Sequence, residues 1–205
     1  MSRKAAFIDR DGVLNEERAF VHRAEDFEFV PGAVEALKAL REAGYALVVV
    51  TNQSGIARGL YPESDYHDLT AHMRERLRAA GVELDAVEYC PHLPDAPVSR
   101  YRLDCDCRKP KPGMLRKAIE ALDLDPGASF LVGDRLSDLE AGRAAGVGSC
   151  FLVRTGYPLS DEALARADGV YDDLLGCVRS LLSRRAVAGI SRPDGSQGAP
   201  SRGQR

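Results

Sequence analysis

Apolar residues along the chain alternate between short continuous runs and longer stretches in which they recur at every third or fourth position. The continuous runs predict buried strands, and the spaced stretches predict amphipathic helices. Together they indicate an α/β fold, a doubly wound (Rossmann-like) and mostly parallel sheet. The predicted strands lie at residues 5–8, 46–50, 87–89, 130–132, 150–153 and 170–171. The predicted helices lie at residues 32–42, around 66–77, and at 114–122, 138–145, 162–167 and 174–182.

Two segments lack this periodicity. Residues 90–112 are rich in Pro, Asp, Arg and Cys, and this length is too great for an ordinary connection, so the segment is either functional or disordered. From residue 186 on, Gly, Ser, Pro, Gln and Arg dominate, which predicts a disordered tail at 186–205. We therefore expect a single domain at residues 1–185, with no insertion long enough for a separate cap domain.

Composition excludes several classes of function. The chain has 205 residues, 44% of them hydrophobic, which is enough for a normal core. A net charge of −3 argues against non-specific nucleic-acid binding. No apolar run is long enough to span a bilayer, and the N-terminus lacks the apolar centre of a signal peptide. We expect a cytoplasmic protein with neither a nucleic-acid nor a membrane partner.

Polar side chains follow three of the predicted strands. Asp9 and Asp11 follow the first strand, and Thr51 follows the second. Asp134 follows the run at 130–132 after one glycine. Taken singly, Asp9 and Asp11 are as typical of a turn as of a functional site. A lone Thr51 or Asp134 after a strand is typical of a helix cap. Because parallel strands end at one edge of the sheet, we expect the three groups to converge, with the acids binding Mg²⁺.

Three of the five cysteines cluster with a histidine in the segment without periodicity. Three thiolates and one imidazole complete a tetrahedral Zn²⁺ site and leave no open position, so the metal would be structural. The alternative is a set of reduced, partly buried cysteines beside a chance histidine. The predicted zinc ligands are Cys90, His92, Cys105 and Cys107.

The polar motifs resemble those of a known superfamily. Asp9–Val13, Thr51-Asn52, Lys109 and Gly133-Asp134 with Asp138 resemble the four ordered motifs of the haloacid dehalogenase superfamily. Residues 49–59 and 105–114 resemble more closely the D-glycero-D-manno-heptose 1,7-bisphosphate 7-phosphatases, close relatives of the histidinol-phosphate phosphatases. The C-x-H and C-x-C pairs of the zinc loop, residues 90–107, are similar to theirs.

The resemblance implies a Mg²⁺-dependent phosphatase that removes the C7 phosphate through an aspartyl-phosphate, in ADP- or GDP-heptose precursor biosynthesis. Asp9 would be the nucleophile and Asp11 the general acid and base. Thr51 and Lys109 would hold the phosphoryl oxygens. Asp9, the Asp11 carbonyl and Asp134 would hold Mg²⁺. Histidinol-phosphate phosphatase is the alternative, because it shares these residues.

Substrate recognition is assigned to loop residues near these motifs. Arg108, between a zinc ligand and the catalytic lysine, would clamp the other phosphate or ring oxygens of a sugar phosphate. The remaining predicted substrate-binding residues are Glu17, Arg18, Ala19, Phe20, Asn52, Gln53, Ser54 and Arg135. For Gln53 and Ser54, capping of the next helix is an equal alternative.

Other classes of function compete with this interpretation. A non-catalytic zinc-loop interaction protein would be expected to lack Asp9, Asp11, Lys109 or Asp134, and all four are present. A phosphomutase would be expected to carry a substantial cap. We therefore expect a monomeric enzyme whose only partner is its small-molecule substrate.

Overall fold

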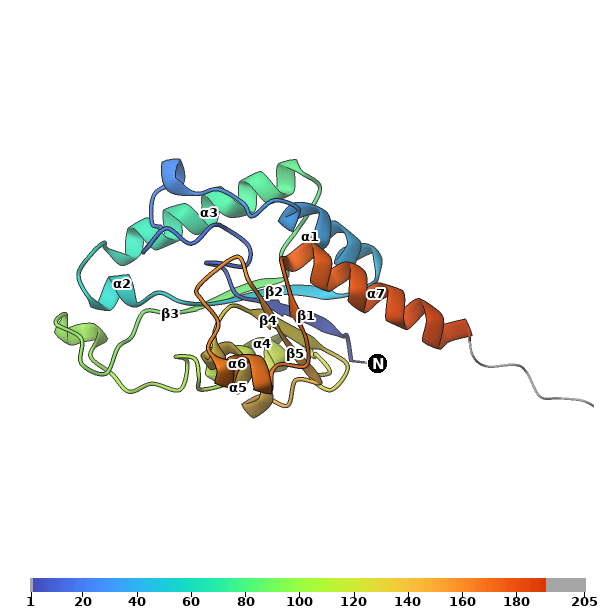
Figure 1. Ribbon diagram of the computed structural model, residues 1–205. Coiled ribbons are helices and arrows are strands. Elements are labelled where there is room, and N and C mark those ends of the chain that lie inside the picture. Colours follow the sequence, from blue (N-terminus) through green and yellow to red (C-terminus); the bar gives the residue numbers. More distant parts are fainter. Residues whose placement is uncertain (1, 191–205) are drawn as a thin grey trace, which may run out of the picture.

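The computed structural model describes residues 2–190 and contains one six-stranded sheet (Figure 1). All neighbouring strands are parallel, in the order β3-β2-β1-β4-β5-β6. The predicted α/β, doubly wound sheet is therefore confirmed. The strands are β1 (Ala5–Ile8), β2 (Ala46–Asn52), β3 (Ala86–Cys90), β4 (Phe130–Gly133), β5 (Ser149–Val153) and β6 (Val170–Tyr171).

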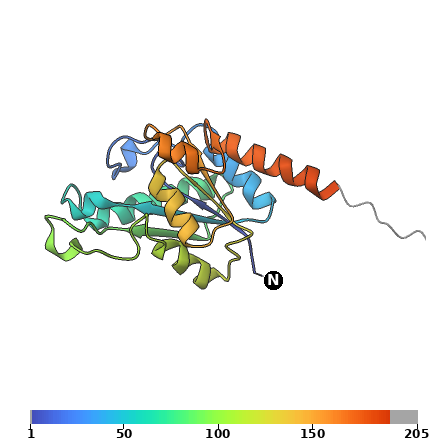
Figure 2. The same ribbon diagram turned by 60° about the horizontal axis from the view of Figure 1, so that its bottom comes forward.

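Helices cover both faces of the sheet (Figures 1 and 2). Helices α1, α3 and α7 pack on one face, and α4, α5 and α6 on the other. The helices are α1 (Ala33–Glu42), α2 (Ser54–Ala57), α3 (Glu63–Ala79), α4 (Gly113–Leu122), α5 (Leu136–Ala144), α6 (Asp161–Arg166) and α7 (Leu174–Ile190). Two 3₁₀ turns, η1 (Ala24–Asp26) and η2 (Ser99–Tyr101), lie in the loops.

The continuous apolar runs follow from this double coverage. In the central strand β1, Ala6 and Ile8 face one helical layer, whereas Ala5 and Phe7 face the other, because successive side chains of a strand point to opposite faces. All four are fully buried. The strand is therefore packed on both faces, and its carboxyl end is a rigid support for Asp9, the residue that follows it.

Most observed elements differ from the predicted ones by only one or two residues at their ends, and three differences are notable. The second strand extends to Asn52, and the four-residue helix α2 was not predicted, because four residues are too few to show a helical period. Helix α7 runs to Ile190 and so includes the first five residues of the predicted tail. Ala-Val-Ala at 186–188 extends a helix that is already nucleated, which costs little. Residues 191–205 lie outside the described part of the chain.

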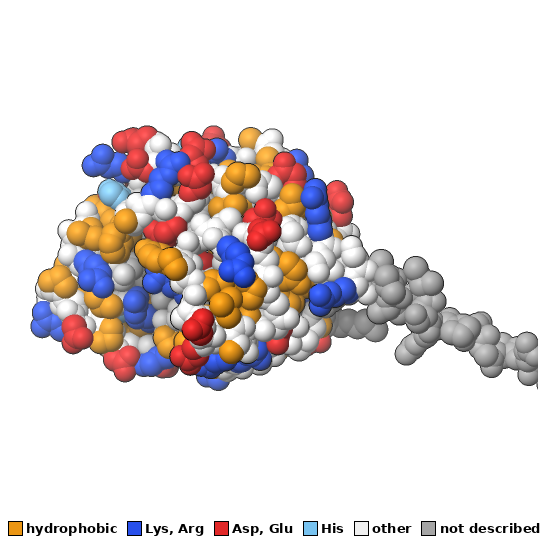
Figure 3. Space-filling view, viewed as in Figure 1, with side chains coloured by type: hydrophobic (Ala, Val, Ile, Leu, Met, Phe, Trp, Pro, Cys, Tyr) orange, Lys and Arg blue, Asp and Glu red, His pale blue; other side chains and the backbone are white. Residues whose placement is uncertain are grey.

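Within residues 2–190, no separate cap domain follows β1 or β2, as expected. None of the helices described there has the length and apolar character needed to cross a membrane. On the face seen in Figure 3, acidic and basic side chains are interspersed.

Candidate active site

A cavity of about 480 Å³ opens at the carboxyl ends of β1, β2 and β4, the edge at which parallel α/β sheets bind ligands. The predicted residues that line it are Asp9, Asp11, Glu17, Phe20, Thr51, Asn52, Gln53, Ser54, Arg108, Lys109 and Arg135. Asp138, which the sequence places in one motif with Asp134 without an assigned role, also lines it. The lining residues that were not predicted to lie there are Arg58, Tyr61, Pro110, Ser137 and Tyr157.

Asp9 is fixed directly at the end of β1. Its backbone N–H donates to the carbonyl of Val132 on the neighbouring strand at 3.0 Å, and the residue is only 8% exposed. Its Oδ1 lies 2.9 Å from Lys109 Nζ. Burial raises the pKa of Asp9 well above its usual value, and the Lys109 ammonium opposes that rise. The Lys109 ammonium therefore favours the charged form of this carboxylate.

Lys109 is buried with three partners for its three N–H donors. Nζ lies 2.9 Å from Asp9 Oδ1 and 2.6 Å from Asp138 Oδ1, and it donates to the Val50 carbonyl at 2.8 Å. Although burial opposes it, the carboxylates of Asp138 and Asp9 raise the pKa of Lys109. The ammonium is therefore a fixed positive charge beside the end of β1. Asn52 orders the loop that carries the lysine, because its side chain bonds the main-chain N–H and C=O of Lys109, both at 3.1 Å.

The carboxylates of Asp9, Asp134 and Asp138 supply oxygens that lie within 4.8 Å of one another. Asp134 is 2% exposed, and its Oδ1 has no hydrogen-bond partner. Burial, followed by the charge of Asp138, raises the pKa of Asp134 to about 6. Buried carboxylates that repel one another and leave an oxygen unused fit a hard divalent cation such as Mg²⁺. Asp138, named from the sequence as part of a motif but not as a metal ligand, contacts Lys109 through one oxygen and accepts from the backbone N–H of Arg135, the residue before α5, through the other.

Asp134 is also confined by glycines. A Cβ placed on Gly156 would lie 2.0 Å from Asp134 Oδ2, and one on Gly12 would lie 2.7 Å from it. The loop after β5 approaches this closely because Tyr157 N–H donates to Asp134 Oδ2 at 3.0 Å. Only glycine fits at position 156, and the carboxylate is therefore held in one orientation.

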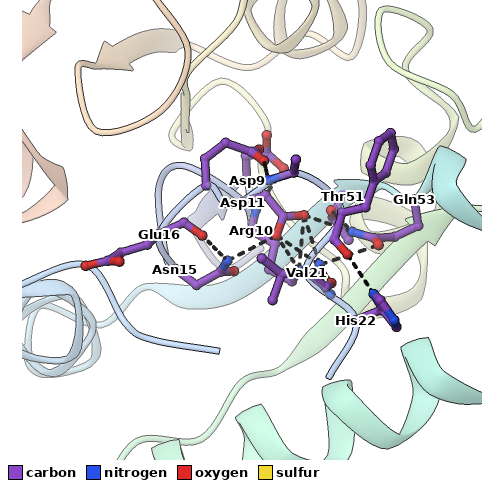
Figure 4. A network of polar contacts seen from close by, with 12 residues as sticks. Asp9, Arg10, Asp11, Asn15, Glu16, Val21, His22, Thr51 and Gln53 are labelled. Atoms are coloured by element: carbon purple, nitrogen blue, oxygen red, sulfur yellow. Dashed lines mark hydrogen bonds and ion pairs between the residues drawn. The ribbon is translucent and has the colours of Figure 1, made fainter. Parts of the chain in front are cut away.

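Asp11 faces a different set of partners from Asp9 (Figure 4). Arg10, which is 1% exposed, donates to both oxygens of the Asp11 carboxylate at 2.9–3.2 Å. Gln53 Nε2 donates to Asp11 Oδ2 at 3.0 Å, and Asn15 Nδ2 donates to Oδ1 at 3.1 Å. Sequence reasoning missed Arg10, although a cation between two acids at the end of a buried strand was a signal for it.

Gln53 joins this network to Thr51. Its Nε2 donates to Thr51 Oγ1 at 2.8 Å, while its Oε1 accepts from the Tyr61 hydroxyl at 2.8 Å. Thr51 is buried, and its hydroxyl oxygen accepts this bond. Among the described residues no acceptor takes the hydroxyl proton of Thr51, which is therefore available to an anion in the cavity.

The predicted recognition segment at residues 17–20 only partly lines the cavity. Glu17 and Phe20 do so, whereas Arg18 and Ala19 are not among the lining residues. Arg18 instead forms an ion pair with Glu16 at 2.6 Å. The reason is a backbone turn: Ala19 and Phe20 both have positive φ, 50° and 64°, so consecutive side chains point in different directions.

The four predicted zinc ligands converge. The Sγ atom of Cys107 lies 3.1 Å from that of Cys90, 3.0 Å from that of Cys105 and 3.4 Å from His92 Nδ1. The cysteines are free thiols, and the four ligand atoms lie within 4.8 Å of one another. This Cys₃His donor set fits a closed tetrahedral Zn²⁺ site. The cluster is connected to the cavity through Arg108, which lines the cavity. Arg108 follows Cys107 in the chain and donates to the His92 carbonyl at 3.4 Å.

Comparison with known proteins gives a consistent result. Residues 6–89 match the family model of haloacid dehalogenase-like hydrolases, and residues 106–177 match a second HAD-hydrolase-like model. The D-glycero-beta-D-manno-heptose-1,7-bisphosphate 7-phosphatase of Escherichia coli (strain K12) is 48% identical over 184 residues, covering 90% of this chain and 96% of that protein. The protein of the same name from Photorhabdus laumondii is 48% identical over 83% of this chain and 90% of its own.

Solved structures agree with these relatives. The D,D-heptose 1,7-bisphosphate phosphatase from B. bronchiseptica, complexed with magnesium and phosphate, superposes with a TM-score of 0.76 at 35% identity. The alignment covers 88% of this chain and 99% of that one. The corresponding phosphatase from Burkholderia thailandensis gives a TM-score of 0.63 at 33% identity, with the same coverage of both chains.

Proposed function

Because the chain belongs to the haloacid dehalogenase-like hydrolases, we propose that it removes the C7 phosphate of D-glycero-D-manno-heptose 1,7-bisphosphate and so supplies precursors of ADP- or GDP-heptose. The β anomer is the proposed substrate, since the names of the curated relatives specify it. The observation that carries the proposal is the position of Asp9, which lines the cavity together with Lys109 and shares an acidic cluster with Asp134.

Asp9 is the proposed nucleophile. Its carboxylate attacks the phosphorus in line with the leaving sugar oxygen and forms an aspartyl-phosphate. The position at the end of a strand that is paired on both sides limits its movement, which favours an in-line approach. Lys109 keeps a positive charge beside it and beside the incoming phosphoryl oxygens.

Asp11 is the proposed general acid and base. It protonates the oxygen that leaves with the sugar, and it then takes a proton from the water that cleaves the aspartyl-phosphate. Arg10, Gln53 and Asn15 hold its carboxylate at the cavity wall. Thr51 donates its free hydroxyl proton to a phosphoryl oxygen, a charge-stabilising contact.

Two metals complete the proposal. Asp9, the main-chain carbonyl of Asp11 and Asp134 would hold Mg²⁺, which when bound neutralises charge on the phosphoryl group. Cys90, His92, Cys105 and Cys107 would hold a structural Zn²⁺. That zinc would order the loop that presents Arg108 to the cavity, where Arg108 and Arg135 are the proposed contacts for the rest of the bisphosphate.

The substrate assignment is tested by kcat/KM for four compounds: both anomers of heptose 1,7-bisphosphate, histidinol phosphate and fructose 1,6-bisphosphate. We expect the β-heptose bisphosphate to exceed each of the others by at least about tenfold, equivalent to about 1.4 kcal/mol of transition-state binding. A higher kcat/KM for histidinol phosphate would contradict the proposal.

A further inference from the structure

His22 lies just beyond the segment at residues 17–20 and contacts it (Figure 4). Its Nδ1 is 2.8 Å from the main-chain oxygen of Phe20. A carbonyl oxygen only accepts hydrogen bonds, so Nδ1 carries the proton. The imidazole ring stacks on the ring of Tyr61, with centroids 4.7 Å apart and planes 3° from parallel. One ring therefore ties this segment to a side chain that lines the cavity.

The segment needs such a tie because its backbone is strained. Ala19 and Phe20 have φ values of 50° and 64°, in the left-handed region that non-glycine residues rarely occupy, and they are adjacent. Phe20 lines the cavity while 43% exposed, so packing alone does not hold it. Glu17 contributes a local support, because its Oε1 accepts from the N–H of Ala19 at 2.8 Å.

Two side chains outside the segment fix the exit of this turn. Arg10 Nη2 donates to the carbonyl of Val21 at 2.9 Å, and His22 donates to that of Phe20. Arg10 also binds Asp11, so its removal would disturb the general acid directly. No hydrogen bond or ring contact within residues 2–190 joins His22 to Asp9, Asp11 or Thr51. His22 is thus the support that can be removed separately from the reacting groups.

We propose that His22 is a positioning residue, which holds residues 17–20 in the left-handed turn that places Glu17 and Phe20 against the sugar of the substrate. The proposal rests on the proposed function in so far as the substrate is a sugar phosphate. Both the neutral Nδ1–H tautomer and the imidazolium donate to the Phe20 carbonyl, so the tie does not require one charge state.

The test compares two substrates in the His22→Ala variant. We expect kcat/KM for heptose 1,7-bisphosphate to fall about tenfold, mainly through KM, because a loosened loop loses its contacts with the sugar. For p-nitrophenyl phosphate, which has no sugar to contact, we expect kcat and KM to stay unchanged. His72→Ala is the matched control, since His72 is also half-buried beside an aromatic ring. That ring belongs to Phe27, which does not line the cavity, whereas the partner of His22, Tyr61, does.

Two results would overturn the proposal. One is an unchanged kcat/KM for the bisphosphate in His22→Ala. The other is an equal fall in kcat/KM for both substrates, which would mean that the substitution acts on Asp11 through Tyr61 and Gln53. If His22→Ala does not fold, His22→Phe keeps a ring against Tyr61 and removes the donor, and it should raise KM for the bisphosphate alone. Failure of wild type to hydrolyse heptose 1,7-bisphosphate would reject the proposed function instead. The comparison is then made with the sugar phosphate that wild type prefers.

Discussion

Asp9 and Asp11 are two residues apart, yet their carboxylates have different surroundings. Asp9 is buried next to Lys109, whereas Asp11 is held by Arg10 and Gln53 at the cavity wall. Because successive side chains of a strand point to opposite faces, an i, i+2 pair would share a face if the strand continued. It does not: a turn follows at once, and this separates the proposed nucleophile from the proposed acid and base.

Asp9→Asn tests the nucleophile. The amide is isosteric but does not attack phosphorus, so we expect kcat for the bisphosphate to fall at least about a thousandfold. Thermal unfolding and zinc content should match wild type, because the Cys₃His cluster is separate from Asp9. Retained turnover in a preparation free of wild-type enzyme would refute the assignment.

Gly156→Ala tests the confinement of Asp134. The added methyl group would lie 2.0 Å from Asp134 Oδ2, so the carboxylate must leave its present orientation in the acidic cluster. We expect the Mg²⁺ concentration that gives half-maximal activity to rise about tenfold or more. Gly176→Ala in α7 is the matched control, because its Cβ meets only Asp173 Oδ1 at 3.4 Å, and its Mg²⁺ dependence should equal that of wild type.

For single residues, the sequence predicted which residues meet at the site but not the directions of their side chains. Asp9, Thr51 and Asp134 were predicted to converge because each follows a strand, and all three lie at the cavity or in the acidic cluster beside it. The ion pair of Lys109 with Asp138 was not predicted, nor was the role of Arg10. Such contacts depend on how separate loops cross above the sheet, which no local pattern records.

The zinc loop is the element in which sequence and structure agree most directly. Its four candidate ligands were named from residue types and spacing alone, and they lie within 4.8 Å of one another. The helices and strands were also predicted, because burial on two faces leaves continuous apolar runs. Helix α2 and the extension of α7 to Ile190 were not, since a four-residue helix has no period and helix ends depend on context.

Cys107→Ser tests the loop as a unit. Loss of a thiolate should abolish stoichiometric zinc and lower the free energy of unfolding by about 2 kcal/mol, which lowers Tm by roughly 4–8 °C. Metal analysis and thermal unfolding measure both effects. Cys177→Ala, which removes a buried thiol in α7 outside the cluster, should keep its zinc. Full zinc occupancy in Cys107→Ser would contradict the ligand assignment.

For the whole molecule, the two proposed metals should be separable by chelation. Brief treatment with EDTA should abolish phosphatase activity, and Mg²⁺ should restore it, because hard oxygen sites bind Mg²⁺ weakly and exchange it. Prolonged treatment with a strong zinc chelator should lower Tm, and Mg²⁺ should not reverse this. Activity assays and thermal unfolding on the same samples measure the two effects; activity that survives EDTA would reject the Mg²⁺ assignment.

The monomeric state and the cytoplasmic location stay predictions.

The central position of β1 has a consequence for synthesis of the chain. Ile8 pairs with Val49 on one side but with Val132 on the other. While the ribosome is still making residues between these two partners, one edge of an apolar strand has no neighbour. Such edges are templates for pairing with other chains. The nascent protein should therefore be most prone to aggregation midway through translation, and a holding chaperone should bind it there rather than earlier or later.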